Sequence, residues 1–143
     1  MTKISTYLNF AGKTEEAFRF YRSVFGGEFT WLQRFKDTPE GLTLSAEEQE
    51  KIMYIALPIG KTDTLMGTDA LESQGFSLIQ GNSQHIFVGT GSETEAKNLF
   101  EGLSAGGKIT MPLEETFWGA YFGTCIDKFG INWMISYDFN QPA

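Results

Sequence analysis

The stretch ISTYLNFAGKTEEAFRFYRSVFGGEFT (Ile4–Thr30) decides the fold, because a second copy of its pattern, SQHIFVGTGSETEAKNLFEGLSAGGKIT, occupies Ser83–Thr110. Each copy begins with a short apolar segment, crosses a glycine-containing turn and enters a run with helical spacing. Each then closes on two glycines, a charged residue, an apolar residue and threonine. Self-similarity of this kind predicts two copies of one structural module in a single chain.

The helical runs of the two copies match in detail. The first carries apolar residues at intervals of three and four, on one stripe of a helix: Ala17, Phe20, Tyr21 and Val24. The second repeats the stripe 79 positions later (96 − 17): Ala96, Leu99, Phe100 and Leu103. The glycine pairs lie 80 apart (106 − 26), which predicts one added residue near Ala105. Helices are expected to begin at Thr14 and at Ser92, whose spacing to Glu95 is that of a capping box.

Turn residues and strand-like runs complete each module. Helices are expected at Thr14–Phe25 and Ser92–Leu103. Strands are expected at Ile4–Phe10, Glu28–Phe35, Ile52–Ile59, Thr64–Thr68, Gln84–Val88, Lys108–Met111 (ended by Pro112), Tyr121–Ile126 and Ile131–Tyr137. The polar segment between residues 36 and 51 is expected to be a loop with one helical turn at Ala46–Glu50. This order predicts an α+β fold of tandem βαβββ modules with curved mixed sheets.

Size and composition favour one domain, 1–143, with module one at 1–72, a connection at 73–83 and module two at 84–143. The net charge of −7 disfavours nucleic acid as a partner. The single cysteine, Cys125, fits a reducing compartment, and no apolar run reaches membrane-spanning length. We therefore expect a cytoplasmic protein with no membrane partner. Two such modules can enclose a cavity between concave sheet faces, and a ligand site is expected there.

An ordered series of short motifs carries a family resemblance. They are YLNF (7–10), EEA (15–17), FY (20–21), FGG (25–27), LMGTDA (65–70), WG (118–119) and DKFGINW (127–133). Over nearly the whole chain, the series resembles the vicinal oxygen chelate superfamily of glyoxalase I, ring-cleaving dioxygenases and bleomycin-resistance proteins, and within it the PhnB-like branch. The resemblance implies the glyoxalase/bleomycin resistance/dihydroxybiphenyl dioxygenase-like fold and a homodimer. Members of this branch sometimes carry a demethylubiquinone-methyltransferase label, but the sequence shows no site for S-adenosylmethionine.

Metal-using members of that superfamily place four ligands, usually His, Gln or Glu, on the first and last strands of each module. Counting 15 residues back from Tyr21 and Phe100, and matching the last strands through the repeat, carries these positions over to Thr6, Met66, His85 and Met134. Only His85 is an ordinary ligand for a divalent ion, since thioethers suit Cu(I). No metal or other cofactor is therefore expected.

Several side chains are open to more than one interpretation. His85, the only histidine, is either a catalytic or ligand-contacting group in the cleft or a strand-start residue satisfied by backbone or water. Four aromatic residues are candidates to line the cavity or a subunit contact, with ordinary core packing as the alternative for each: Trp31, Trp118, Tyr121 and Phe122. Of these, Trp118 and Tyr121 are expected in the ligand-binding cleft. Cys125, which has no neighbouring base in the sequence, is interpreted as a buried small hydrophobe instead of a nucleophile.

Three function classes follow from these observations. The first is a protein that binds a small apolar or aromatic molecule in the cleft without a divalent metal, through Thr6, Met66, His85, Met134, Trp118 and Tyr121. The second is a metal- or His-assisted lyase or oxidoreductase of the glyoxalase/dioxygenase type. The third is a structural or interaction module with a filled cleft and a large apolar external patch.

Overall fold

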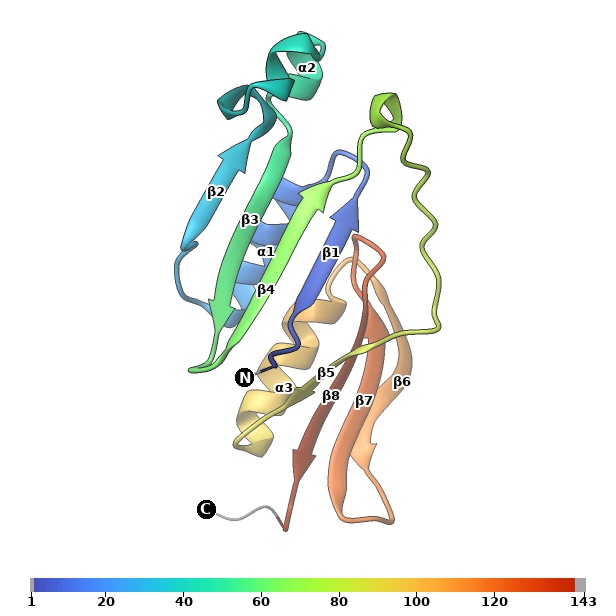
Figure 1. Ribbon diagram of the computed structural model, residues 1–143. Coiled ribbons are helices and arrows are strands. Elements are labelled where there is room, and N and C mark those ends of the chain that lie inside the picture. Colours follow the sequence, from blue (N-terminus) through green and yellow to red (C-terminus); the bar gives the residue numbers. More distant parts are fainter. Residues whose placement is uncertain (1, 141–143) are drawn as a thin grey trace. The chain divides into compact units, whose positions relative to one another are not determined.

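The computed structural model describes residues 2–140, apart from the side chain of Glu40. The chain divides between Ile79 and Gln80 into two compact units, coloured blue to green and yellow to red in Figure 1. The division lies inside the connection predicted at 73–83. Within the described residues, no helix is long and apolar enough to cross a membrane.

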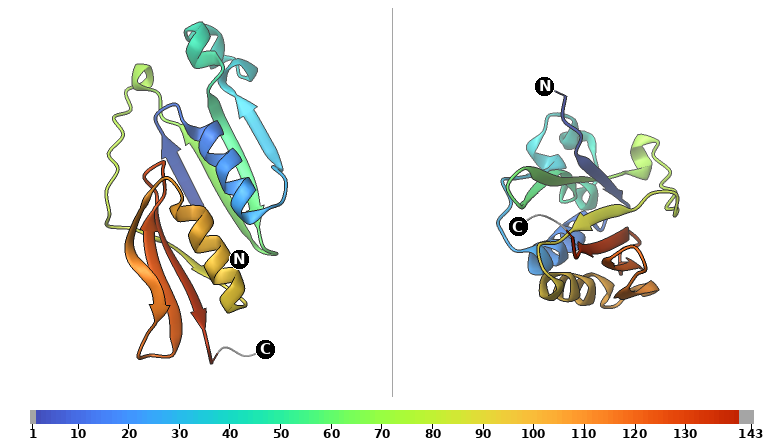
Figure 2. Two further views of the ribbon diagram at one scale, coloured as in Figure 1. Left: turned by 180° about the vertical axis from the view of Figure 1, so that it is seen from behind. Right: turned by 90° about the horizontal axis from the view of Figure 1, so that it is seen from below.

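Unit 1 is a four-stranded sheet with one long helix. Its elements are β1 (Thr6–Phe10), α1 (Thr14–Phe25), β2 (Trp31–Arg34), η1 (Phe35–Asp37), η2 (Glu40–Thr43), α2 (Ala46–Gln49), β3 (Ile52–Ile59), β4 (Asp63–Asp69) and η3 (Glu72–Gln74). The strand order is β1-β4-β3-β2, with β1 parallel to β4 and the other pairs antiparallel. Two opposite views show α1 along one face of this sheet (Figures 1 and 2).

Unit 2 repeats this arrangement. Its elements are β5 (Ile86–Gly89), α3 (Glu93–Ser104), β6 (Lys108–Glu115), β7 (Ala120–Ile126) and β8 (Asn132–Asp138). The strand order is β5-β8-β7-β6, again with one parallel pair, β5 with β8. The predicted fold class, α+β with tandem βαβββ modules and mixed sheets, is confirmed.

The core of unit 1 lies between α1 and the sheet. Ala17, Phe18 and Tyr21 are fully buried on the helix side, so the buried stripe includes Phe18 in place of the predicted Phe20. A glycine on β4 makes this packing possible: a Cβ on Gly67 would lie 2.6 Å from the Phe18 ring, closer than any side chain tolerates. In α3 the predicted stripe residues Ala96, Phe100 and Leu103 are buried.

The N-termini of the two long helices are capped differently. In α3, the hydroxyl of Ser92 accepts a hydrogen bond from the backbone N–H of Glu95 (3.0 Å), as predicted. In α1, the expected cap at Thr14 is absent because the cap position is Lys13, which makes no side-chain cap bond. Instead, the buried carboxylate of Asp69 on β4 accepts from the backbone N–H and the hydroxyl of Thr14 (3.1 and 2.7 Å). A side chain from a distant strand therefore caps this helix, in place of the local cap that the sequence predicted.

Strand β6 continues through Pro112, where the sequence predicted its end. The strand lies at the edge of its sheet and pairs only with β7. The pairing has two register shifts, one on each side of Met111. Proline lacks a backbone N–H, and edge strands and bulges are the places where a sheet accepts it. The prediction was wrong because the sequence does not show that this strand is an edge.

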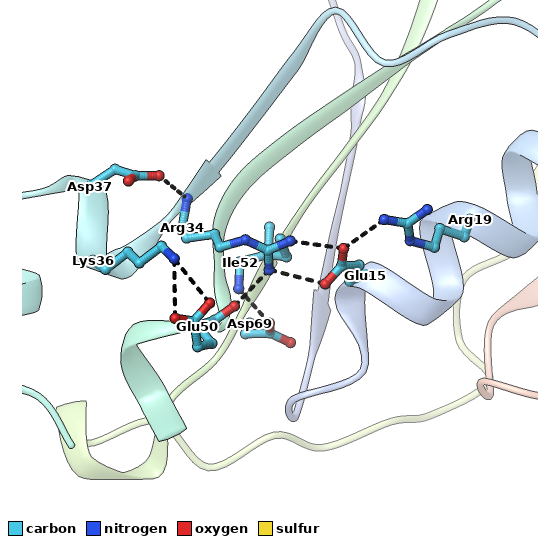
Figure 3. Close-up of polar contacts among 8 residues, drawn as sticks. All are labelled: Glu15, Arg19, Arg34, Lys36, Asp37, Glu50, Ile52 and Asp69. Carbon is cyan, nitrogen blue, oxygen red and sulfur yellow. Dashed lines mark hydrogen bonds and ion pairs between the residues drawn. The ribbon is translucent and has the colours of Figure 1, made fainter. Parts of the chain in front are cut away.

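A network of ion pairs and hydrogen bonds connects the end of β2 and the segment that follows it to α1 and to Glu50 (Figure 3). Arg34 donates two hydrogen bonds to the carboxylate of Glu15 on α1 (3.0 and 2.9 Å) and one to the backbone carbonyl of Glu50 (2.7 Å). Lys36 donates to the carboxylate of Glu50 (3.1 Å). The hydrogen bond from Arg34 is the main reason that the pKa of Glu15 is about 2, below its ordinary 4.5. The pair therefore stabilises the ionised form of Glu15 in the folded protein.

Glu15→Gln is expected to lower the free energy of unfolding by about 1 kcal/mol at pH 7, since the pair is partly exposed to solvent. The folded-state pKa of Glu15 is depressed, so its contribution is complete above about pH 4.5 and is lost as the pH falls toward 2. Urea unfolding at several pH values measures this difference. Glu16→Gln is the control, because that carboxylate makes only a 3.7 Å pair with Lys13. A pH-independent difference for Glu15→Gln would contradict this assignment.

Candidate functional site

Each sheet has one face covered by the helix of its own unit and one face that this helix leaves open. Residues paired in register share a face, so the register defines matching rows of side chains. On the open face of unit 1, one row across the four strands is Trp31, Ala56, Met66 and Tyr7. The corresponding row of unit 2 is Met111, Thr124, Met134 and Phe87. The internal repeat therefore places Met66 and Met134 at equivalent positions.

Three aromatic rings gather on the open face of unit 1, and we call Tyr7, Tyr54 and Trp31 the aromatic row. The Tyr7 and Tyr54 rings are stacked, with centroids 6.2 Å apart and planes 23° apart. The Trp31 ring is 6.3 Å from Tyr54, at 60°. Trp31 is 56% exposed and Tyr7 46%, large fractions for side chains of this size. The indole N–H of Trp31 donates to the side-chain oxygen of Gln33 (3.3 Å), which helps to orient the ring.

Among the described residues that the strand register places on the open face of unit 1, none is Lys, Arg, His, Asp or Glu. The residues that the register places on it are Tyr7, Asn9, Trp31, Gln33, Tyr54, Ala56, Pro58, Thr64, Met66 and Thr68. Burial raises the pKa of the Tyr7 phenol; a hydrogen bond with Thr68 opposes this, and the nearby Tyr54 reinforces it. Tyr7 is therefore uncharged at neutral pH. The face offers π surfaces, amides, hydroxyls and a thioether, with no formal charge.

The open face of unit 2 is also largely apolar, but one end of it carries the carboxylate of Glu114. Phe122 pairs with Ser136, and its ring meets the exposed Trp118 ring edge-on at 5.9 Å. Glu114 pairs with Phe122 at the same end of the sheet, so its carboxylate belongs to this end of the face. At this end, the face therefore combines the rings of Trp118 and Phe122 with the carboxylate of Glu114.

The structure places most of the predicted site residues near these open faces. Met66 and Met134 lie in the two equivalent rows. Trp118, in the turn before β7, contacts Phe122 with its ring. His85 is exposed and directly precedes β5. These residues belong to two separate units.

Thr6 and Tyr121 lie on the helix-covered faces, contrary to expectation. Thr6 pairs with Leu65, which is buried in the core, so it cannot share a face with Met66. Ten positions separate Tyr7 from Ala17, whereas nine separate Phe87 from Ala96, so counting back equally from both helices is wrong by one residue. Tyr121 lies on the side of α3, where the ammonium of Lys97 is 5.5 Å from its ring centroid.

Tyr7, Tyr54 and Phe87 were not predicted as site residues from the sequence; of the aromatic row, only Trp31 was, as one of four aromatic candidates for the cavity lining. Tyr7 was noted only as part of a family motif, because the count from Tyr21 pointed to its neighbour. Along β1, Tyr7 and Asn9 alternate with Leu8 and Phe10. The alternation was a usable signal, but aromatic or apolar residues occur in both sets, so it does not identify the open face.

The side chains of the open faces do not fit a divalent metal. Among the described residues, no three His, Cys, Asp or Glu side chains are grouped so that they could hold an ion. The equivalent positions on the paired first and last strands carry a phenol and a thioether in unit 1, and a phenyl ring and a thioether in unit 2. Divalent ions prefer imidazole, carboxylate and water. The donor set therefore supports ligand contact without a metal.

Cys125 is not part of either open face. It is fully buried on the α3 side of β7, in register with Trp133. Burial, with a contribution from Asp127, raises the pKa of its thiol to about 11. A nucleophilic cysteine needs a lowered pKa and access, so the interpretation of Cys125 as a buried hydrophobe agrees with the structure.

Paired βαβββ modules with an open sheet face in each define a glyoxalase-like protein. The family described as the Glyoxalase/Bleomycin resistance protein/Dioxygenase superfamily matches residues 3–135, and the chain belongs to it. It is 33% identical to Protein YjdN from Escherichia coli K12, over 98% of each chain.

Two solved structures are also similar. Protein PA1353 from Pseudomonas aeruginosa has 33% identity and a TM-score of 0.85, covering 96% of this chain and 98% of that one. The PhnB protein from Bacillus cereus, whose name carries a provisional 3-demethylubiquinone-9 3-methyltransferase label, has 26% identity and a TM-score of 0.75, covering 95% and 99%. The resemblance to the PhnB-like branch is confirmed.

Proposed function

We propose that this protein binds a small apolar or aromatic molecule on the open sheet faces of its modules, without a divalent metal. The aromatic row carries the proposal. Folded proteins usually bury large aromatic side chains, yet Trp31 and Tyr7 leave about half of their surface in contact with solvent on a face without formal charge. Neighbouring rings offer a flat apolar surface, and Gln33 and Asn9 offer amides that can orient a ligand.

Titration of the ¹⁵N-labelled protein with a panel of one- and two-ring aromatic compounds tests this proposal. We expect amide shifts concentrated in the strands that carry the aromatic row. Tyr54→Leu, which removes the central ring, is expected to weaken the best ligand about 3- to 10-fold, the contribution of one aromatic contact.

Phe29→Leu is the matched control, because it also removes a ring from unit 1. That ring lies outside the strands, with the guanidinium of Arg22 4.7 Å from its centroid. Equal weakening by the two variants, or shifts confined to residues away from the open faces, would overturn the proposal. Absence of binding across the panel would overturn it as well.

A His-assisted lyase or oxidoreductase is the alternative. His85 favours it, since this exposed side chain lies two residues before Phe87, a member of the unit 2 row. The alternative predicts that His85→Ala abolishes a turnover found in a substrate screen and leaves the amide spectrum of the folded protein unchanged. Turnover that survives in His85→Ala would exclude this role.

The proposal includes a homodimer, for which the family resemblance is the support, and a place in the cytoplasm, which the single cysteine favours. Light scattering after size-exclusion chromatography measures the mass directly against the 16.0 kDa chain. A mass near 32 kDa, twice that of one chain, is the expected result.

A further inference from the structure

We propose that the aromatic row of Tyr7, Tyr54 and Trp31 selects planar organic cations, meaning flat heteroaromatic rings that carry a delocalised or alkylated positive charge. This inference deepens the proposed function and rests on it, because it names the ligand class that the open face of unit 1 prefers. It is carried by three observations: the ring geometry, the charge of the face and the fixed orientation of the indole.

The geometry offers more than one π surface to a single ligand. Trp31 and Tyr54 meet at 60° with centroids 6.3 Å apart, and Tyr7 is nearly parallel to Tyr54 at 6.2 Å. A cation within about 6 Å of a ring centroid is attracted by the ring quadrupole, most strongly by tryptophan. A flat ligand on Trp31 would lie within this range of the indole and close to the Tyr54 ring. Stacking and charge attraction then act together.

The charge of the surroundings distinguishes cations from anions. No Lys, Arg or His lies among the residues of this face, so a carboxylate or phosphate would find no charged partner. Residues 1–79 hold eight Lys and Arg against eleven Asp and Glu, which makes the potential around unit 1 negative on average. A cationic ligand is attracted by this potential and an anionic one is repelled.

The indole ring of Trp31 is already oriented in the protein without a ligand. Its N–H donates to Gln33, two residues along the same strand, and its ring packs against Tyr54. A ring that is already oriented loses little conformational freedom on binding, so more of the contact energy contributes to affinity. Cation–π contacts are weak at exposed sites, and this orientation favours a measurable effect.

Three matched two-ring probes test the inference at pH 8: N-methylquinolinium as the cation, quinoline as the neutral compound and 2-naphthoate as the anion. The readout is the indole N–H signal of Trp31, assigned by its disappearance in Trp31→Leu. N-methylquinolinium is expected to bind about 5-fold more tightly than quinoline, the ratio that about 1 kcal/mol of cation–π attraction produces. Naphthoate is expected to bind more weakly than quinoline.

Variants locate the preference on the row. Amide shifts of β3 and β4 report binding where the Trp31 signal is missing. Trp31→Leu is expected to remove most of the preference for the cation, and Trp31→Phe to retain part of it, since a phenyl ring has a weaker quadrupole interaction than indole. Phe29→Leu, which removes a ring of unit 1 that lies outside the strands, is expected to leave the preference unchanged.

The outcomes separate the two proposals. Equal affinities for quinoline and N-methylquinolinium would overturn the cation preference and leave the proposed function standing. Tighter binding of naphthoate, or a preference that persists in a folded Trp31→Leu variant, would also overturn it. Shifts confined to β5 to β8 would overturn the cation preference of unit 1 alone. If none of the three probes, nor any compound of the aromatic panel, moves the signals of either open face, both proposals fail.

Discussion

Asp69→Ala is expected to lower the free energy of unfolding of unit 1 by about 3 to 5 kcal/mol, because three buried donors would lose their acceptor. Asp69 accepts from the backbone N–H and hydroxyl of Thr14 through one oxygen, and from the backbone N–H of Ile52 through the other (2.8 Å). This single carboxylate thus joins β4 to the start of α1 and to the start of β3.

Native-state amide hydrogen exchange in α1 and β3 measures this loss for unit 1 separately. Asp63→Ala, at the exposed start of the same strand, is the control and is expected to change the free energy by less than about 0.5 kcal/mol. Asp69→Asn keeps the oxygen that faces Thr14 but turns an N–H₂ group toward the N–H of Ile52, so its effect should be concentrated at β3. Similar protection in Asp69→Ala and Asp63→Ala would contradict the role of this carboxylate.

Asp127→Ala is expected to have a comparable effect on unit 2, also about 3 to 5 kcal/mol. One oxygen of Asp127 accepts from the backbone N–H groups of Phe129 and Ile131 (2.8 and 3.1 Å). The other accepts from the indole N–H of Trp133 (2.8 Å), which is 1% exposed. The carboxylate therefore shapes the turn between β7 and β8 and also satisfies a buried donor in the core.

The indole signal of Trp133 reports this loss directly. In Asp127→Ala its N–H is expected to exchange with solvent faster, together with the amides of β7 and β8. Asp138→Ala is the control, because this exposed carboxylate at the end of β8 accepts only from the backbone of Asn140. Unchanged exchange at Trp133 in Asp127→Ala would show that the indole bond contributes little to the stability of the unit.

The two carboxylates illustrate the limits of local sequence patterns. Asp127 lies in the sequence DKFG, and its turn was predicted from those residues alone, whereas its bond to Trp133 was not. The cap at Thr14 was predicted from the residues that follow it, but the acceptor belongs to Asp69, 55 positions later. Local patterns locate turns and helix ends well, and they do not show which distant group completes the hydrogen bonds.

The sequence by itself determined the two modules, because each repeats the same helical stripe, glycine pair and strand order. The helix Thr14–Phe25 and the strand Ile52–Ile59 were predicted to the residue, since glycine, charged residues and the apolar period mark their ends. The places of Met66 and Met134 in equivalent rows also follow from the repeat. The ends of the helix and of the strand depend on interactions between residues that are near in the chain.

Only the tertiary structure decided which side chains occupy the open faces. A shift of one residue moves a strand side chain to the opposite face, and β1 (5 residues) is one residue longer than β5 (4 residues), so Tyr7 and not Thr6 lies on the open face. Tyr54 joined Tyr7 and Trp31 because strand pairing brings β1, β3 and β2 into one sheet. Register and strand order are set by contacts between distant segments, which is why the aromatic row became visible only in the folded chain.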